Sequence, residues 1–314
     1  MKVAVVQMNS GEDKAQNLST AERLLIEAAE RGAELAVLPE LFTYLGRRGK
    51  HREVADAIPG TTSELLTRLA RARRLRIVGG SFLETAPGHE RLFNTCLAVD
   101  ADGSVVARYR KLHLFDVDVD GKRYRESDTM APGEDVVLTK LGDVPVGLTI
   151  CYDLRFPELY RRLGAAGARV ITAPSAFTFE TGKDHWDLLV RTRAVENQVF
   201  VLAAAQFGSH PPGLACYGNA MIVDPWGTAL ARARSGVRGA GRPRLRAPGS
   251  SPCEPAGAEP PAHGDSRALG PPARARSQLA GLEQLENPRA AAVQMKRVMS
   301  RAARAPISAS FSRF

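Results

Sequence analysis

Short apolar runs bounded by polar or turn-forming residues recur along the first 232 residues of the chain. Runs of this length predict strands that are buried in a sheet. We expect such strands at 3–8, 35–38, 77–82, 94–100, 105–111, 144–151, 170–173, 199–206 and 218–224.

Between these runs, apolar residues spaced three and four positions apart predict helices. The clearest case is the stretch from Ala21 to Ala29, which Gly32 can end. Further helices are expected at 65–73, 157–163 and 185–197. Helices alternate with strands, and the turn 100–103 indicates a hairpin, so the pattern favours an α/β fold with mixed sheets.

Residues 112–135 are polar and follow neither period. The sequence therefore predicts a long loop there. Loops of this length inside a compact domain are usually functional.

Composition changes sharply near Arg232. The chain has 314 residues and a net charge of +9, yet residues 1–232 contain 29 basic and 29 acidic side chains. Residues 233–314 contain 14 basic and 5 acidic side chains, with 10 Pro and 8 Gly. We therefore predict a neutral folded body at 1–232 and a basic tail at 233–314, for which disorder is the expected state.

Several classes of protein are excluded by the rest of the composition. Four cysteines in 314 residues do not make a disulfide scaffold. No apolar run approaches the roughly 18 residues that a membrane span requires. With no secretory segment predicted, we expect a cytoplasmic protein with reduced thiols. Cys96, Cys216 and Cys253 lack metal-ligand spacing, so no metal site is expected.

Three side chains that can perform chemistry each end a predicted strand. Cys151 precedes a helix that begins near Pro157, and the backbone N–H groups of this turn are expected to favour its thiolate. Glu40 would gain the pKa of a general base if it is partly buried. Lys111 can act as a fixed cation beside an oxyanion.

Each of these residues also has a purely structural interpretation. Cys151 can be a small buried hydrophobic residue, Glu40 a solvated loop acid and Lys111 an exposed lysine at a sheet edge. Glu126, in the long loop, is weak evidence alone. The combination is more informative, because strand ends meet at one edge of an α/β sheet, where ligands bind.

Three segments carry a resemblance to a known family. Leu38-Pro39-Glu40, the stretch 109–116 (YRKLHLFD) and the stretch 150–158 (ICYDLRFPE) resemble the nitrilase superfamily of carbon–nitrogen hydrolases. The resemblance runs from residue 1 to about 232, and the stretch 174–182 with His185-Trp186 is similar to the branch of deaminated-glutathione amidases and omega-amidases. It implies an α-β-β-α sandwich and a Glu-Lys-Cys triad that acts without a metal or organic cofactor.

The resemblance also implies roles for individual residues. Cys151 would be the nucleophile, Glu40 the general base and Lys111 the oxyanion stabiliser, helped by the backbone N–H of Tyr152. Glu126 would be a second glutamate that orients the nucleophile and the substrate. The carboxylate end of the substrate would be surrounded by Arg155, Phe177 and Thr181.

The implied substrate is a small-molecule amide of a 2-oxo acid. The segments 203–206 and 217–221 are closer to the deaminated-glutathione side, so we predict hydrolysis of deaminated glutathione to 2-oxoglutarate and cysteinylglycine. The alternative is omega-amidase action on 2-oxoglutaramate or 2-oxosuccinamate. The resemblance further implies a homodimer if the fold is complete.

The tail 233–314 has no counterpart in the family, whose members continue with further strands. Its bias toward Arg, Ala, Pro and Gly is that of a shifted reading frame in GC-rich DNA, a hypothesis that resequencing the gene tests. A genuine basic extension for nucleic acid or a membrane surface is the other interpretation. Nucleic acid is disfavoured because Phe311 and Phe314 are the only aromatic residues of the tail. Apolar residues that include Val293 and Val298 could also form short helices, broken at Pro288. Because the C-terminal segment differs from that of the family, a further alternative is an inactive protein of the same fold.

Overall fold

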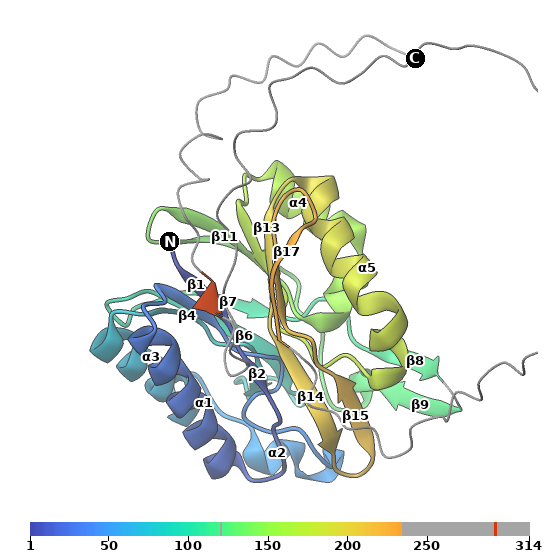
Figure 1. Cartoon of the computed structure of the whole chain (residues 1–314). Coiled ribbons are helices and arrows are strands. Elements are labelled where there is room, and N and C mark those ends of the chain that lie inside the picture. The colour runs from blue at the N-terminus through green and yellow to red at the C-terminus, as the bar shows by residue number, and fades with distance from the viewer. Residues whose placement is uncertain (120, 234–291, 294–314) are drawn as a thin grey trace, which may run out of the picture. The chain divides into compact units, whose positions relative to one another are not determined.

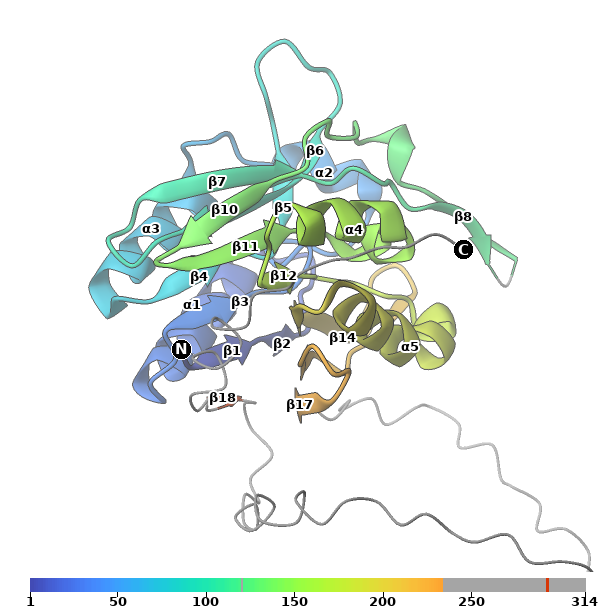
Figure 2. The ribbon, with the colours of Figure 1, turned by 90° about the horizontal axis from the view of Figure 1, so that it is seen from above.

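The computed structural model describes residues 1–119, 121–233 and 292–293. These residues belong to one unit, in which two β-sheets pack face to face and each carries helices on its outer face (Figures 1 and 2). This arrangement is the expected α-β-β-α sandwich with mixed sheets.

The first sheet contains seven strands, of which the inner three run parallel. In spatial order they are β18 (Ala292–Val293), β1 (Val3–Val5), β3 (Leu35–Val37), β4 (Arg76–Val78), β6 (Phe93–Val99) and β5 (Phe82–Glu84), with β7 (Val105–Arg110) also paired to β6. Because β4–β6 and β6–β7 are both antiparallel, β7 runs in the same direction as β3.

The second sheet contains six strands around a parallel centre. They are β10 (Leu138–Leu141), β11 (Val144–Leu148), β12 (Val170–Thr172), β13 (Phe200–Ala203), β16 (Met221–Val223) and β17 (Ala229–Arg232).

Two smaller sheets complete the described part. One joins the two halves of the sandwich, because β14 (Ala205–His210) pairs with both β15 (Leu214–Tyr217) and β2 (Gln7–Met8). The other is a hairpin of β8 (Asp116–Val119) and β9 (Lys122–Arg125).

Alternation along the strands explains the layers. In β1 and the residue after it, Ala4 and Val6 face α1 (Lys14–Glu30) and α3 (Thr61–Arg73), whereas Val3 and Val5 face the second sheet. The second sheet is covered by α4 (Pro157–Ala165) and α5 (Phe179–Asn197), seen on the opposite side in Figure 2. The short helix α2 (His51–Val54) follows the turn η1 (Arg48–Lys50).

Several expected elements differ from those observed. The expected strands 3–8, 77–82 and 199–206 are each broken in two. Helix α5 begins at Phe179 rather than 185, because the Thr178 side chain accepts a hydrogen bond from the N–H of Thr181. The prediction of a long loop at 112–135 was wrong in part, since this segment contains the β8–β9 hairpin and the 3-10 turn η2 (Glu126–Asp128).

The predicted tail 233–314 lies outside the described residues, apart from Ala233, Ala292 and Val293. Val293 lies in strand β18, not in a short helix as its spacing suggested. Within the described ranges, no helix is long and apolar enough to cross a bilayer.

Candidate active site

The ends of three strands place the three predicted catalytic side chains. Glu40 lies three residues after β3, Lys111 directly follows β7, and Cys151 opens the turn η3 (Cys151–Arg155) just after β11. These strands belong to two sheets, so the expectation of a single sheet edge was wrong. The sandwich brings the residues together because β3 and β7 end on the same side and β11 ends opposite them.

Lys111 is the centre of the cluster. Its Nζ lies 2.9 Å from Glu40 Oε1 and 2.8 Å from Glu126 Oε2, and its side chain is only 2% exposed. Burial acts to lower the pKa of Lys111, but the Glu126 and Glu40 carboxylates outweigh it and hold the pKa well above its usual value. The lysine is therefore a permanent cation at neutral pH.

The Glu40 carboxylate is held on both oxygens. Asn94 Nδ2 donates to Glu40 Oε1 at 3.0 Å and to Glu126 Oε1 at 3.1 Å, and the backbone N–H of Ala176 donates to Glu40 Oε2 at 2.8 Å. Asn94 was missed from the sequence. Its only signal there is a polar side chain, followed by Thr95, at the start of a strand that is otherwise apolar.

The backbone carbonyl of Glu40 is fixed as well. Gln206 Nε2 donates to it at 3.0 Å and to Ser10 Oγ at 2.8 Å, and all three side chains are buried. A residue of β14 thereby fixes the position of a residue that follows β3.

Cys151 has a backbone conformation that side chains rarely adopt. Its φ is +49°, and its N–H donates to Pro174 O at 2.8 Å. A non-glycine residue in this region costs about 1–3 kcal/mol, so the surrounding turn must hold it there. The strain directs the thiol away from the regular path of the strand.

The expectation of a Cys151 thiolate was wrong. Burial first, and then the neighbouring Glu40 carboxylate, raise the pKa of the thiol well above its usual value, and Lys111 only partly offsets this. The resting group is a thiol next to a carboxylate, so a base must remove its proton before it can attack.

These residues lie at one end of a cavity of about 610 Å³. This volume is in the range of small-molecule sites, which span roughly 300–1,000 Å³. The inner wall holds Glu40, Lys111, Glu126 and Cys151, and further lining residues include Leu41, Leu45, Arg47, Arg48, His51, Phe115, Arg123, Ala176, Thr178 and Leu214.

The four residues predicted to bind substrate lie next to this cavity but do not line it. The Arg155 guanidinium is 3.3 Å from His185 Nδ1 and 5.3 Å from the centre of the Phe177 ring. Phe177 packs against Trp186, the Thr181 hydroxyl bonds to that of Thr178, and the Tyr152 ring packs against Phe115 and Phe156.

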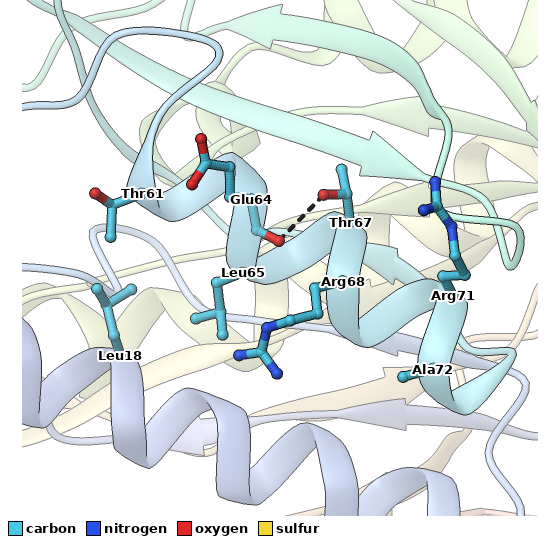
Figure 3. A pocket seen from close by; sticks show the side chains of 8 residues that line it. All are labelled: Leu18, Thr61, Glu64, Leu65, Thr67, Arg68, Arg71 and Ala72. Carbon is cyan, nitrogen blue, oxygen red and sulfur yellow. Dashed lines mark hydrogen bonds between the residues drawn. The ribbon is translucent and has the colours of Figure 1, made fainter.

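A second hollow, of about 700 Å³, lies outside the sandwich between α1 and α3 (Figure 3). Its walls contain apolar side chains, threonines, one carboxylate and two arginines. Both arginines are held by neighbours, Arg68 by Glu22 and Arg71 by the carbonyl of Asp102. No thiol or buried charge pair faces it, so it does not compete as a reaction site. In the part of the chain described, no group of three His, Cys, Asp or Glu side chains can hold a metal ion.

The fold and the buried Glu–Lys–Cys cluster together define a hydrolase of the α-β-β-α class. Residues 2–239 match the carbon-nitrogen hydrolase family, and the chain belongs to that family, within the nitrilase superfamily. It is therefore an enzyme that acts on amides.

Named relatives fall in two groups. A deaminated glutathione amidase from Bos taurus is 44% identical over 242 residues, covering 74% of this chain and 73% of that protein. The omega-amidase NIT2 from Danio rerio is 39% identical over 235 residues, covering 74% and 84%. The crystal structure of Saccharomyces cerevisiae Nit3, a member of branch 10 of the nitrilase superfamily, is 34% identical with a TM-score of 0.68, covering 74% of this chain and 85% of that one.

Proposed function

We propose that the protein hydrolyses the amide bond of deaminated glutathione to 2-oxoglutarate and cysteinylglycine. The observation that carries the proposal is the convergence of Glu40, Lys111 and Cys151 at the end of a 610 Å³ cavity. The 44% identity to a deaminated glutathione amidase supports the choice of substrate.

The first half of the reaction forms a thioester. A Glu40 carboxylate oxygen takes the proton of the Cys151 thiol, and Sγ attacks the amide carbon. The carbonyl electron pair moves to oxygen, and the oxyanion lies against Lys111. An ammonium has three N–H donors, and two already bind Glu40 and Glu126, so one remains for the oxyanion. Glu40 then gives its proton to the leaving amine as the C–N bond breaks.

The second half releases the acid. Glu40 takes a proton from water, whose oxygen attacks the thioester carbon, and the Cys151 thiolate leaves and recovers the proton. Glu126 touches Lys111 rather than the thiol, so its proposed role is to position the ammonium. We also propose that 1–232 forms the catalytic domain, since every residue of this machinery lies within it.

For the substrate-binding residues we propose an indirect part. The Thr181 hydroxyl bonds to that of Thr178, and Phe177 directly follows Ala176; Thr178 and Ala176 line the cavity. The Tyr152 backbone N–H remains a proposed second oxyanion donor. To bind the substrate carboxylate as proposed, the Arg155 guanidinium has to give up its contact with His185.

Omega-amidase action on 2-oxoglutaramate is the second candidate, favoured by the 39% identity to an omega-amidase. Steady-state kcat/KM on both substrates decides between them, and we expect deaminated glutathione to be preferred. Turnover of 2-oxoglutaramate alone would reverse this order. The Cys151→Ala variant should show no burst of amine; absence of a burst from the folded parent protein would instead indicate an inactive member of the family.

As partner we propose a second copy of the chain, because Leu188, Val195 and Trp226 leave apolar side chains exposed. A reducing compartment such as the cytoplasm is proposed because Cys96, Cys151 and Cys216 are all free thiols.

A further inference from the structure

Arginine side chains line the reaction cavity opposite its buried end. Arg47, Arg48 and Arg123 all belong to the lining, and Arg123 is exposed, whereas Lys111 is buried. They therefore lie toward the solvent side of the same cavity. None of them takes part in the mechanism proposed for the buried cluster.

The three arginines differ in how their charge is compensated. Arg47 forms a close ion pair with Glu12, which also accepts from the Arg47 backbone N–H. Among the described residues, the one ion pair of Arg48 is a long contact of 3.4 Å to Asp128, with side chains 41% and 63% exposed. The Arg123 side chain makes no ion pair or hydrogen bond with any residue that the structure describes; Asp118, opposite it in the hairpin, pairs with Arg125 instead. Arg48 and Arg123 therefore keep charge available for a ligand.

The β8–β9 hairpin brings these two arginines together. Arg48 Nη1 donates to the backbone carbonyl of Arg125 at 2.7 Å. Arg123 is two residues earlier on the same strand, and alternate residues of a strand share a face. The Arg48 guanidinium therefore lies against the strand segment that carries Arg123.

The same hairpin fixes the distance to the buried cluster. Arg125 directly precedes Glu126, whose carboxylate is 2.8 Å from Lys111 Nζ. The path from the Arg48 guanidinium to the lysine is thus one hydrogen bond, one peptide link, one glutamate side chain and one ion pair, at most roughly 13 Å. His51 lines the same cavity, and its pKa is lowered by burial and then by Arg48, while Glu126 raises it.

We infer that Arg48 and Arg123 form a subsite for a carboxylate of the substrate, an inference that rests on the proposed function. An extended dipeptide spans about 7 Å. Adding one contact with the cluster at one end and one with a guanidinium at the other gives a length close to the path between Lys111 and Arg48. The free carboxylate of the cysteinylglycine half fits this geometry. The carboxylate of the 2-oxo acid half offers the same chemistry, and the experiment separates the two sources.

The experiment compares kcat/KM for deaminated glutathione, for its C-terminal carboxamide and for 2-oxoglutaramate. We expect the parent protein to prefer the free acid over its carboxamide, and Arg48→Gln/Arg123→Gln to reduce that ratio about 10- to 100-fold, with Arg48→Lys in between. The matched control is Arg52→Gln, an exposed arginine outside the cavity, which should leave the ratio unchanged. If instead the double variant weakens 2-oxoglutaramate and spares the ratio, the subsite binds the 2-oxo acid carboxylate.

Binding to the Cys151→Ala protein, measured by calorimetry with deaminated glutathione, keeps the subsite and the reaction separate. A loss of affinity of about tenfold or more in the Arg48/Arg123 double variant supports the subsite. If the parent protein shows no turnover, the proposed function is wrong, but this result on the subsite still holds. If the parent protein turns over substrate, but neither the affinity nor the ratio of kcat/KM values changes in the double variant, the subsite is overturned. The proposed function is then unaffected. Circular dichroism of each variant shows that it is folded.

Discussion

At the scale of single residues, the permanent charge of the cluster and its reactive group belong to different side chains, Lys111 and Cys151. The Glu126 and Glu40 carboxylates keep Lys111 a cation, while burial and then Glu40 keep the Cys151 thiol protonated. Reactivity then appears only when a substrate carbonyl can accept electron density next to the ammonium. This arrangement protects a buried thiol from ionising without substrate.

The protonated thiols predict how stability depends on pH. Burial raises the pKa of Cys96 and Cys216, and that of Cys151, above the usual 9.0, so the folded chain keeps three protons that the unfolded chain loses. A raised folded pKa gives stability that is complete below pH 9 and falls as pH rises. We expect the free energy of unfolding to fall between pH 9 and 10, with a slope that is smaller by up to about 1.4 kcal/mol per pH unit in Cys151→Ala. Urea unfolding across this range measures it, and equal slopes in both proteins would contradict the prediction.

At the scale of elements, one buried carboxylate joins the two sheets beside the cluster. Asp153 is fully buried in η3 and accepts from both sides of the sandwich: Tyr109 Oη at 2.6 Å, His113 N at 3.1 Å and Ile150 N at 2.8 Å, with His113 Nδ1 at 2.7 Å. Tyr109 and His113 lie on either side of Lys111, and Ile150 precedes Cys151. Asp153 is therefore a positioning residue that fixes the end of β7 relative to the nucleophile turn.

Asp153→Asn keeps the size of the side chain but removes an acceptor and the charge. We expect kcat to fall about 10- to 100-fold with little change in KM. The substrate contacts remain, but the Lys111 ammonium and the Cys151 thiol are no longer held in the correct relative position. The pH midpoint of Cys151 alkylation by iodoacetamide should also shift, which loss of stability alone does not cause. Asp187→Asn, a partly exposed aspartate that pairs with Arg232, is the control. If KM rises while the alkylation profile stays unchanged, Asp153 does not position the cluster.

The packing of α5 against β15 gives a prediction about stability alone. A Cβ added at Gly182 would lie 2.3 Å from the Cβ of Tyr217, so Gly182→Ala must push the helix from the strand. We expect a loss of about 1–3 kcal/mol in the free energy of unfolding. Gly49→Ala, where a Cβ meets open space, serves as the matched control in denaturant titrations. A loss at Gly182 no larger than at Gly49 would show that the helix can shift freely.

How much of this was predictable depends on which interactions are local. Glu40, Lys111 and Cys151 were found because each interrupts or ends an apolar strand, a pattern visible in the sequence. Their distribution over two sheets was not predicted, since strand order is set by contacts between distant residues. Asn94 was missed because polar residues at the start of an apolar strand have no distinctive local pattern. The β8–β9 hairpin was missed because its polar strands pair only with each other.

At the scale of the whole molecule, apolar side chains remain exposed along one face. Leu188 and Val195 on α5 are 65% and 49% exposed, and Trp226, in the turn before β17, is 88% exposed. The turn lies on this helix, because Arg191 Nε donates to the carbonyl of Gly227 at 2.7 Å. An apolar strip of this kind is typical of a protein interface, so we propose that it pairs with the same strip of a second copy.

Trp226→Asp places a charge at the centre of this strip. We expect it to raise the dimer dissociation constant at least about tenfold, as loss of a central aromatic residue usually does. Light scattering after size exclusion, over a range of protein concentrations, measures this. Val105→Asp on β7, also exposed, is the control, and a parent protein that is monomeric at every concentration would falsify the proposal.

The link between Gln206 and Glu40 also constrains how the protein is made. The base needs a partner 166 residues later in the chain, and strand β2 needs β14 as its pairing partner. At about 5–20 residues per second, a ribosome leaves the N-terminal half waiting on the order of 10 seconds or more before these partners emerge. Contacts this distant in sequence also slow folding once the chain is free. The nascent chain therefore holds Glu40 before it holds the strand that fixes it, and this interval is when it depends most on protection from aggregation.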